Sequence, residues 1–198
     1  VLKKKLADEG PDLQFLVNNA GLGKVGPFEK LGTDEQLQMV DLNVRALTHL
    51  SHIAIPYMFP GAQMIQVASS IGFCAAPNFA VYAATKAYVI SLSEALKFEL
   101  RPRGINVTAV CPGPVATEFQ AVAAKSEFTK NKAEQEEPFN KALIANAEDV
   151  VRKALADAAK GRHFSIFGAP IKLFVGALPF IPHSITMKAL SRRNTQKN

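Results

Sequence analysis

Short apolar runs alternate along the chain with longer segments in which apolar residues recur every three or four positions. A short apolar run bounded by Gly, Asn, Ser or Pro is typical of a strand buried in a parallel sheet. The longer segments are typical of amphipathic helices. The pattern predicts strands at residues 13–17, 62–68, 105–110 and 163–167, and helices at residues 1–9, 33–58, 79–100 and 147–159.

The order of these elements indicates the fold class. Strands that alternate with helices form right-handed βαβ units, and the strands of such units are parallel. We therefore predict an α/β fold, a doubly wound parallel sheet of the Rossmann type. The domain is expected to cover residues 1–168, and residues 169–198 form a C-terminal tail.

The long helix at residues 33–58 has a predicted start. Thr33 is followed three residues later by Gln36, which is the pattern of a capping box with Thr33 as the N-cap. The helix then carries an apolar stripe that is expected to face the core, at Leu37, Val40, Val44, Leu47 and Leu50.

The net charge of +6 is concentrated near the C-terminus. No Asp or Glu follows Asp157. The seven basic residues beyond it carry a charge of +7, which is larger than the net charge of the whole chain. Two interpretations stay open, a solvated basic terminus and a basic surface that contacts anionic lipid or nucleic acid. No nucleic-acid-binding module is recognisable, so nucleic acid is not expected as a partner.

The tail at residues 169–198 is apolar as well as basic. Its uncharged run at residues 173–187 is too short, and too often interrupted by Pro, to span a bilayer. Such a segment can lie at a membrane surface, cover a substrate pocket or form a subunit interface. The sequence leaves these three alternatives open.

The only cysteines are Cys74 and Cys111, and neither has a metal-binding or redox spacing. Isolated thiols fit a reducing compartment, so we expect a cytoplasmic protein, with the tail allowing peripheral contact with a membrane, and no metal site. The chain starts with Val1, and its first residues are not expected to be a signal peptide, because no apolar core follows them. We expect it to begin inside a longer protein.

Polar or glycine-containing turns follow three of the predicted strands, at residues 18–21, 69–70 and 111–113. The carboxyl ends of parallel strands lie at one edge of a sheet, and ligands bind in the crevice outside them. The three turns are therefore predicted to line a single crevice.

The pattern G-x-G-x-x-G occurs at residues 21–26, and Asp41 lies twenty residues after its first glycine. This spacing is that of a dinucleotide-binding fingerprint. In the fingerprint, however, a helix begins within the glycines and its N-terminus meets the pyrophosphate. Here Pro27 follows the glycines and the helix is predicted to begin near Thr33. We therefore reject a pyrophosphate site at this position.

Tyr82 and Lys86 lie one helical turn apart, and Ser69 precedes the tyrosine by thirteen residues. The spacing places the phenol and the ammonium on one face of a helix. A cation beside a phenol favours the phenolate and lowers the phenol pKa from about 10. A tyrosine tuned in this way can exchange a proton with an alcohol or a ketone. The Ser69 hydroxyl is placed to hold the substrate oxygen.

These residues resemble the active site of the short-chain dehydrogenase/reductase family. Residues 18–21, Asn-Asn-Ala-Gly, match a family motif, and Asn43, Ser69, Tyr82 and Lys86 match its catalytic tetrad. The resemblance implies that Tyr82 is the acid/base and that Ser69 orients the carbonyl. It implies that Lys86 lowers the tyrosine pKa and binds the nicotinamide ribose. Asn43 is implied to hold a water that relays protons.

Ser69 is preferred to the adjacent Ser70, because only Ser69 has the family spacing to the tyrosine. The resemblance also implies a nicotinamide cofactor, NADP or NAD, with NADP favoured. Residues 111–117 resemble the family's Pro-Gly segment beside the nicotinamide. The residues implied to contact the cofactor are Asn19, Ala20, Gly21, Tyr82, Lys86, Pro112, Gly113, Val115 and Thr117.

The resemblance covers residues 13–167, but the first part of the family domain has no counterpart. That part is a βαβαβ unit with the Gly-rich turn that holds the pyrophosphate, so roughly 60 to 80 residues are missing. We expect the chain to bind the cofactor poorly and its sheet to expose an edge.

The expected activity is the interconversion of a carbonyl and an alcohol by a homo-oligomer, with residues 117–146 as the substrate lid. A lipophilic substrate is expected because the loop between Ser69 and Tyr82 is apolar. The alternative is a truncated binding or scaffold protein that keeps a vestigial site and does not catalyse a reaction.

Overall fold

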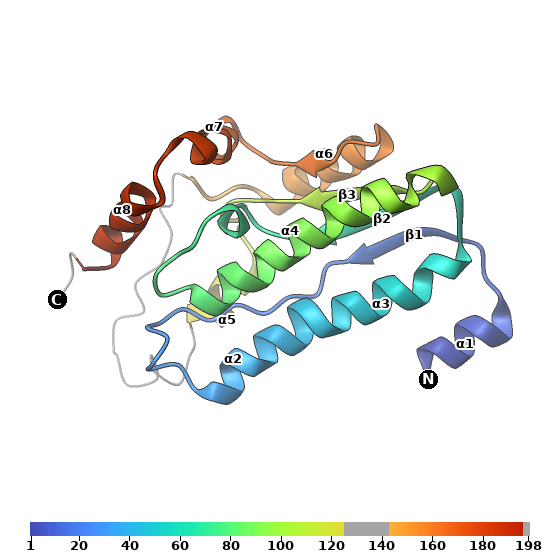
Figure 1. Ribbon diagram of the computed structural model, residues 1–198, viewed down its shortest axis with the longest axis horizontal. Coiled ribbons are helices and arrows are strands. Elements are labelled where there is room, and N and C mark those ends of the chain that lie inside the picture. The colour runs from blue at the N-terminus through green and yellow to red at the C-terminus, as the bar shows by residue number, and fades with distance from the viewer. Residues whose placement is uncertain (125–142, 196–198) are drawn as a thin grey trace.

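Four parallel strands form one sheet at the centre of the computed structural model (Figure 1), which describes residues 1–124 and 143–195. The strands follow each other across the sheet in chain order. This is the predicted α/β doubly wound arrangement. The strands are β1 (Leu13–Asn18), β2 (Met58–Val67), β3 (Asn106–Val110) and β4 (Phe164–Ser165).

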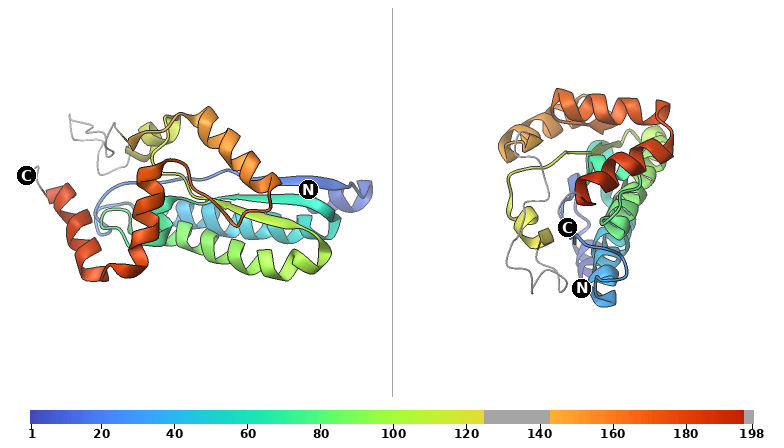
Figure 2. Two further views of the ribbon diagram at one scale, coloured as in Figure 1. Left: turned by 90° about the horizontal axis from the view of Figure 1, so that it is seen from above. Right: turned by 90° about the vertical axis from the view of Figure 1, so that its left-hand side faces the viewer.

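Helices cover both faces of the sheet, as Figure 2 shows. Helices α3 and α4 pack on one face, and α6 packs on the other. The helices are α1 (Leu2–Glu9), α2 (Thr33–Val40), α3 (Leu47–Ala54), α4 (Ala80–Leu100), α5 (Glu118–Ala124), α6 (Ala147–Ala159), α7 (Ala169–Ala177) and α8 (His183–Thr195). A π-helical segment η1 (Asp41–Ala46) joins α2 to α3, and short 3₁₀ segments are η2 (Ile55–Tyr57), η3 (Ser70–Phe73), η4 (Arg101–Arg103) and η6 (Leu178–Phe180).

The core lies between α4 and the sheet. Val89, Ile90, Ala109 and Cys111 are buried in one cluster beneath the middle of α4. A second cluster beneath its C-terminal end contains buried residues of β2 and β3, among them Met64 and Val107. These clusters fix α4, and with it the candidate site residues Tyr82 and Lys86, against the carboxyl ends of the strands.

Strand β1 forms one edge of the sheet within the described residues. Phe15 and Val17 on this strand are 59% and 52% exposed. Val151 and Leu155 of α6 are also exposed, at 55% and 50%. Exposed apolar side chains on an edge strand are unusual in a folded domain. The edge position of β1 and the exposure of its apolar side chains agree with the exposed sheet edge that the sequence predicts.

The start of α2 differs from the predicted capping box. Gly32, not Thr33, is the N-cap, and no side chain caps the helix. The Gln36 side chain instead donates to the backbone oxygens of Phe28 and Leu31, at 3.1 and 3.0 Å. The preceding loop is therefore held by Gln36, and the first helical N–H groups lack the predicted side-chain acceptor.

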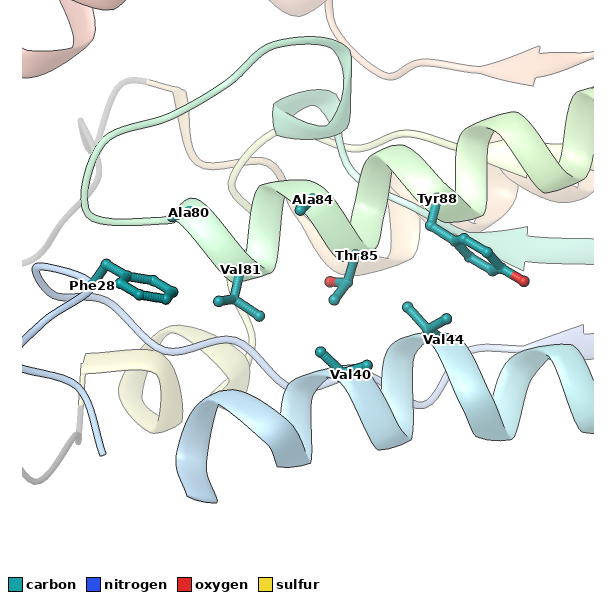
Figure 3. A pocket seen from close by; sticks show the side chains of 8 residues that line it. All are labelled: Phe28, Val40, Val44, Ala80, Val81, Ala84, Thr85 and Tyr88. Carbon is teal, nitrogen blue, oxygen red and sulfur yellow. The ribbon is translucent and has the colours of Figure 1, made fainter. Parts of the chain in front are cut away.

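The predicted apolar stripe faces the core only in part. Leu47 is buried, but Leu37 and Val40 are 55% and 38% exposed. Met39 is the buried residue of α2. Val40 and Val44 instead line an apolar groove of about 460 Å³ between α2–η1 and the first turns of α4 (Figure 3). The groove is lined by Phe28, Val40, Val44, Ala80, Val81, Ala84, Thr85 and Tyr88.

Two other predicted elements have different bounds. The strand expected at residues 62–68 begins four residues earlier, at Met58, because the helix before it ends at Ala54. The tail at 169–195 contains two helices, α7 and α8. Of the predicted lid at 117–146, residues 125–142 lie outside the described part of the chain.

Candidate active site

The turns after the first three strands meet at one end of the sheet, as the sequence predicts. The backbone N–H of Ser70 donates to the Pro112 oxygen at 2.9 Å, which joins the exits of β2 and β3. The exit of β1 is joined to the helical layer through Leu22 and Asn43. Lys86 reaches the same region from α4 and donates to the Val67 oxygen.

Asn43 holds the loop after β1 from a π-helical turn. Its side chain is 1% exposed, accepts from the Leu22 N–H at 2.8 Å and donates to the Leu22 oxygen at 2.8 Å. Its amide nitrogen also donates to Thr85 Oγ1 at 3.0 Å. A π-helical turn is frequent at functional sites because it redirects side chains from the regular helical spacing. Asn43 therefore connects the β1 exit to α4.

Lys86 is almost completely buried, at 4% exposure. Its Nζ donates to the Val67 oxygen at 2.7 Å and lies 5.8 Å from the centre of the Tyr82 ring. A methyl group added at Gly21 would lie 3.3 Å from this Nζ, so the ammonium faces the Asn-Asn-Ala-Gly turn. Burial lowers the pKa of Lys86 to about 8, and Cys111 opposes this shift.

Tyr82 is 8% exposed and lies between two aromatic rings. The ring centroids of Phe79 and Phe119 are 6.3 and 5.6 Å from that of Tyr82. The Ser69 side chain is close enough to the Tyr82 hydroxyl to lower its pKa as a hydrogen-bonding group. Ser70 is also buried, but its backbone N–H is bonded to the next strand exit.

The sequence predicts that the pKa of Tyr82 is lowered, and this prediction is wrong. Burial raises the pKa of Tyr82 to about 12, and the hydrogen bond from Ser69 only partly opposes the rise. The spacing of Tyr82 and Lys86 shows proximity, but it does not show desolvation, which disfavours the phenolate. The Lys86 ammonium is also bonded to a backbone oxygen.

The residues implied to bind the cofactor lie around this centre. Asn19 and Ala20 are exposed after β1, and Asn18 is buried, donating to Ser51 Oγ at 3.0 Å and Gln66 Oε1 at 2.9 Å. Pro112, Gly113, Val115 and Thr117 lie in the segment after β3 and are half-buried except for the exposed Thr117.

The Pro-Gly segment is held in place by neighbouring elements. Val115 pairs with Ala145 in a parallel β-bridge. The Thr117 hydroxyl donates to the Val115 oxygen at 3.5 Å. A methyl group added at Gly113 would lie 2.7 Å from Ile171 Cδ1 of α7. Helix α7 therefore packs directly against this side of the crevice.

Two residues of the site were not singled out from the sequence. Thr85 donates to the Tyr82 oxygen at 2.8 Å and accepts from Asn43, so it connects two tetrad positions. Gly23 passes over the tyrosine ring, because a methyl group there would lie 2.6 Å from Phe119 Cζ and 3.2 Å from Tyr82 Cδ2. The position of Thr85 between Tyr82 and Lys86, inside a predicted helix in which Thr is an unfavourable residue, was a usable sequence signal. The Gly23 contact depends on packing that spacing does not show.

Gly72 allows the serine-bearing loop to pack on α4. A Cβ at this position would lie 2.8 Å from the Lys86 carbonyl carbon and 2.8 Å from Ile90 Cδ1. We expect Gly72→Ala to lower the free energy of unfolding by about 1 to 3 kcal/mol, because the helix backbone cannot move aside easily. Urea denaturation measures the change.

The matched control for Gly72 is Gly176→Ala in α7, where an added methyl group meets no atom within 4 Å. Alanine there is expected to raise the free energy of unfolding by up to about 1 kcal/mol, because Gly is a poor helix former. Equal effects of the two substitutions would contradict the close packing at Gly72.

The family follows from a direct match. The model of the short chain dehydrogenase family matches residues 2–127, which is more than half of the chain. The chain belongs to the short-chain dehydrogenase family. Its tetrad-like residues Asn43, Ser69, Tyr82 and Lys86 all lie within the matched range.

Individual relatives agree with this membership. The chain is 38% identical to an uncharacterized oxidoreductase, DltE, of Bacillus subtilis over 55% of its own length and 45% of the relative's. It is 28% identical to sulfoacetaldehyde reductase 2 of Chromohalobacter salexigens, over 82% and 66%. It spans about half the length of dehydrogenase OXI1 of Cochliobolus heterostrophus, at 47%, with 32% identity over 56% of this chain.

Solved structures show the same fold. A short-chain dehydrogenase from Sphingobium yanoikuyae, in complex with NADPH, superposes with a TM-score of 0.67 and 25% identity. The superposition covers 90% of this chain and 69% of that one. A short-chain dehydrogenase from Burkholderia phymatum, in complex with NAD, has a TM-score of 0.72 at 23% identity, over 88% and 69%.

Proposed function

We propose that the protein is, or is part of, an NAD(P)-dependent oxidoreductase that interconverts a carbonyl and an alcohol. One observation carries the proposal. Tyr82 is buried beside Ser69, and a buried ammonium, Lys86, lies one helical turn away with its Nζ 5.8 Å from the centre of the Tyr82 ring, in a member of this family. This arrangement supplies a proton donor, a group to orient a carbonyl oxygen and a nearby cation.

The proton chemistry follows from the two shifted pKa values. With a pKa of about 12, Tyr82 is protonated near neutral pH and is ready to donate a proton to a carbonyl oxygen. Lys86, with a pKa of about 8, is mostly charged there and attracts the phenolate that the donation creates. Ser69 positions the oxygen that receives the proton. The site is therefore set for the reduction of a carbonyl.

The residues present fit one half of a nicotinamide cofactor. The Lys86 ammonium faces the backbone at Gly21, where a side chain would fill the space between them. We propose that Lys86 and Tyr82 bind the nicotinamide ribose and that Asn19 lies on the adenosine side. Pro112 and the segment after it are proposed to bind on the nicotinamide side. When bound, the cofactor supplies or accepts the hydride.

No described residues form a pyrophosphate site at the glycine pattern, since α2 begins only at Thr33, after Gly26. This agrees with the rejection of a dinucleotide-binding fingerprint at these glycines. We favour NADP over NAD. Both kinds of cofactor occur among the similar solved structures.

The substrate is proposed to be lipophilic, since the rings of Phe79 and Phe119 contact Tyr82 and the loop between Ser69 and Tyr82 is apolar. We also propose a homo-oligomer. The apolar groove between α2–η1 and α4, with Val40 and Tyr88 each more than a third exposed, supports such an assembly.

Calorimetry with NADPH and NADH, followed by turnover assays on apolar ketones, tests the proposal. We expect binding that is weak and stronger for NADPH, and oxidation of the reduced nicotinamide only when a ketone is present. Cofactor binding without turnover of any ketone would favour the non-catalytic binding protein. Absence of binding and turnover at cofactor concentrations that saturate the structural relatives would contradict the enzyme proposal for this chain.

A further inference from the structure

The C-terminal segment 169–191 lies at one end of the molecule, where α7 contacts η3 of the loop after β2 (Figures 1 and 2). Ile171 of α7 contacts Gly113 closely enough to exclude any side chain there. A cleft of about 150 Å³ separates the segment from the loop after β2 and is lined by Phe73, Cys74, Val175, Leu178, Pro179, Ile181, His183 and Thr186. The segment is therefore seated on the domain beside the site.

Three large apolar side chains of this segment are exposed. Leu173 in α7 is 76% exposed, Phe180 in η6 is 87% exposed, and Ile185 in α8 is 56% exposed. Neither α7 nor η6 contains a buried residue. Each of three consecutive elements thus presents one large apolar side chain to water, which is unfavourable unless something covers it.

The charge of the segment indicates what covers it. Lys172 is adjacent to Leu173, and Lys188 lies one helical turn beyond Ile185, and both lysines are exposed. No acidic residue follows Asp157 in the sequence. A second copy of the segment would bring unopposed positive charges together. An anionic lipid surface complements both the charge and the exposed apolar side chains.

We propose that this segment docks the protein on the surface of an anionic phospholipid bilayer, with Leu173, Phe180 and Ile185 entering the headgroup boundary. The contact is peripheral. Among the described residues, no helix has the length and apolarity needed to cross a membrane. The docking does not depend on the proposed enzymatic function, since it uses none of the tetrad residues.

Co-sedimentation of the full chain with vesicles tests the docking. One set of vesicles contains phosphatidylcholine alone, and the other contains phosphatidylcholine with phosphatidylserine. We expect binding to the anionic vesicles only, and weaker binding as the salt concentration rises. Phe180→Ser is expected to lower the partition coefficient by about tenfold or more. Lys172→Gln is expected to lower it by about fivefold.

Two matched controls distinguish binding through this surface from nonspecific adsorption to the vesicles. Phe98→Ser removes a 68% exposed phenylalanine from α4, and Lys3→Gln removes an exposed lysine from α1. Both are expected to leave the partition coefficient unchanged. Circular dichroism of each variant shows that the fold is retained. Exposed positions are chosen so that this requirement is met.

Three results would overturn the proposal. The first is equal binding to neutral and anionic vesicles. The second is equal loss of binding in the tail variants and in the controls. The third is seen by analytical ultracentrifugation without lipid: if Phe180→Ser converts an oligomer to a monomer and no form binds vesicles, a second copy is the partner of this segment.

Discussion

Replacement of Tyr82 by Phe is expected to lower the rate of carbonyl reduction by about 10²- to 10⁴-fold, the usual contribution of a general acid. The ring remains packed against Phe79 and Phe119, so the substitution removes the hydroxyl beside Ser69 and little else. The proton for the alkoxide then has to come from water. The loss should appear mainly in kcat, with a smaller loss of cofactor affinity because the Tyr82 hydroxyl is also proposed to lie on the ribose side.

Tyr88→Phe is the matched control on the same helix. The Tyr88 ring is 37% exposed and its hydroxyl is bonded to Thr48 Oγ1 at 2.8 Å, away from Ser69. This variant should retain the rate of the unchanged protein. Single-turnover measurements at saturating cofactor compare the two variants. Similar rates for Tyr82→Phe and Tyr88→Phe would show that Tyr82 is not the acid.

The pH dependence of the reverse reaction, the oxidation of an alcohol, provides a second test of Tyr82. Oxidation of an alcohol needs the phenolate, and the pKa of about 12 leaves only a small fraction of it near neutral pH. That fraction grows about tenfold per pH unit below the pKa. We expect the oxidation rate to rise with pH in the unchanged protein and to lose this dependence in Tyr82→Phe.

The sequence predicted the layout of the site better than its electrostatics. The strand exits at residues 18–21, 69–70 and 111–113 could be located because polar turns interrupt apolar runs. Parallel topology then requires the exits to meet, and the hydrogen bond from Ser70 to Pro112 shows that two of them do. Local patterns of apolar and polar residues are therefore sufficient to predict where the strands end and that these ends lie together.

Burial and helix geometry could not be predicted in the same way. The π-helical turn at Asn43 depends on its bonds to Leu22 and Thr85, which are 21 and 42 residues away in the sequence. The raised pKa of Tyr82 depends on the rings of Phe79 and Phe119 around it. Spacing along one helix contains no information on these distant contacts. The spacing argument therefore gave the wrong direction for the pKa.

Lys86 is expected to make the stability of the protein depend on pH. Burial lowers its pKa from 10.5 to about 8 in the folded state. Between about pH 8 and 10.5 the unfolded chain therefore binds more protons at this residue than the folded chain, and stability rises with pH. Below about pH 8, the folded protein carries the full cost of a buried ammonium. The contribution across this window amounts to about 3 kcal/mol.

Comparison with Lys86→Met isolates this contribution, because Met fills a similar volume without a charge. Tyr82 and Cys111, whose folded pKa values burial raises to about 12, lower stability as the pH rises through 9 and 10. They are present in both proteins, so their effect largely cancels in the difference. From pH 7 to 10, urea denaturation should show the unchanged protein gaining about 2.5 kcal/mol relative to Lys86→Met. The exposed control Lys160→Met should show no such trend, and parallel curves for Lys86→Met would mean that the buried amine does not titrate in this range.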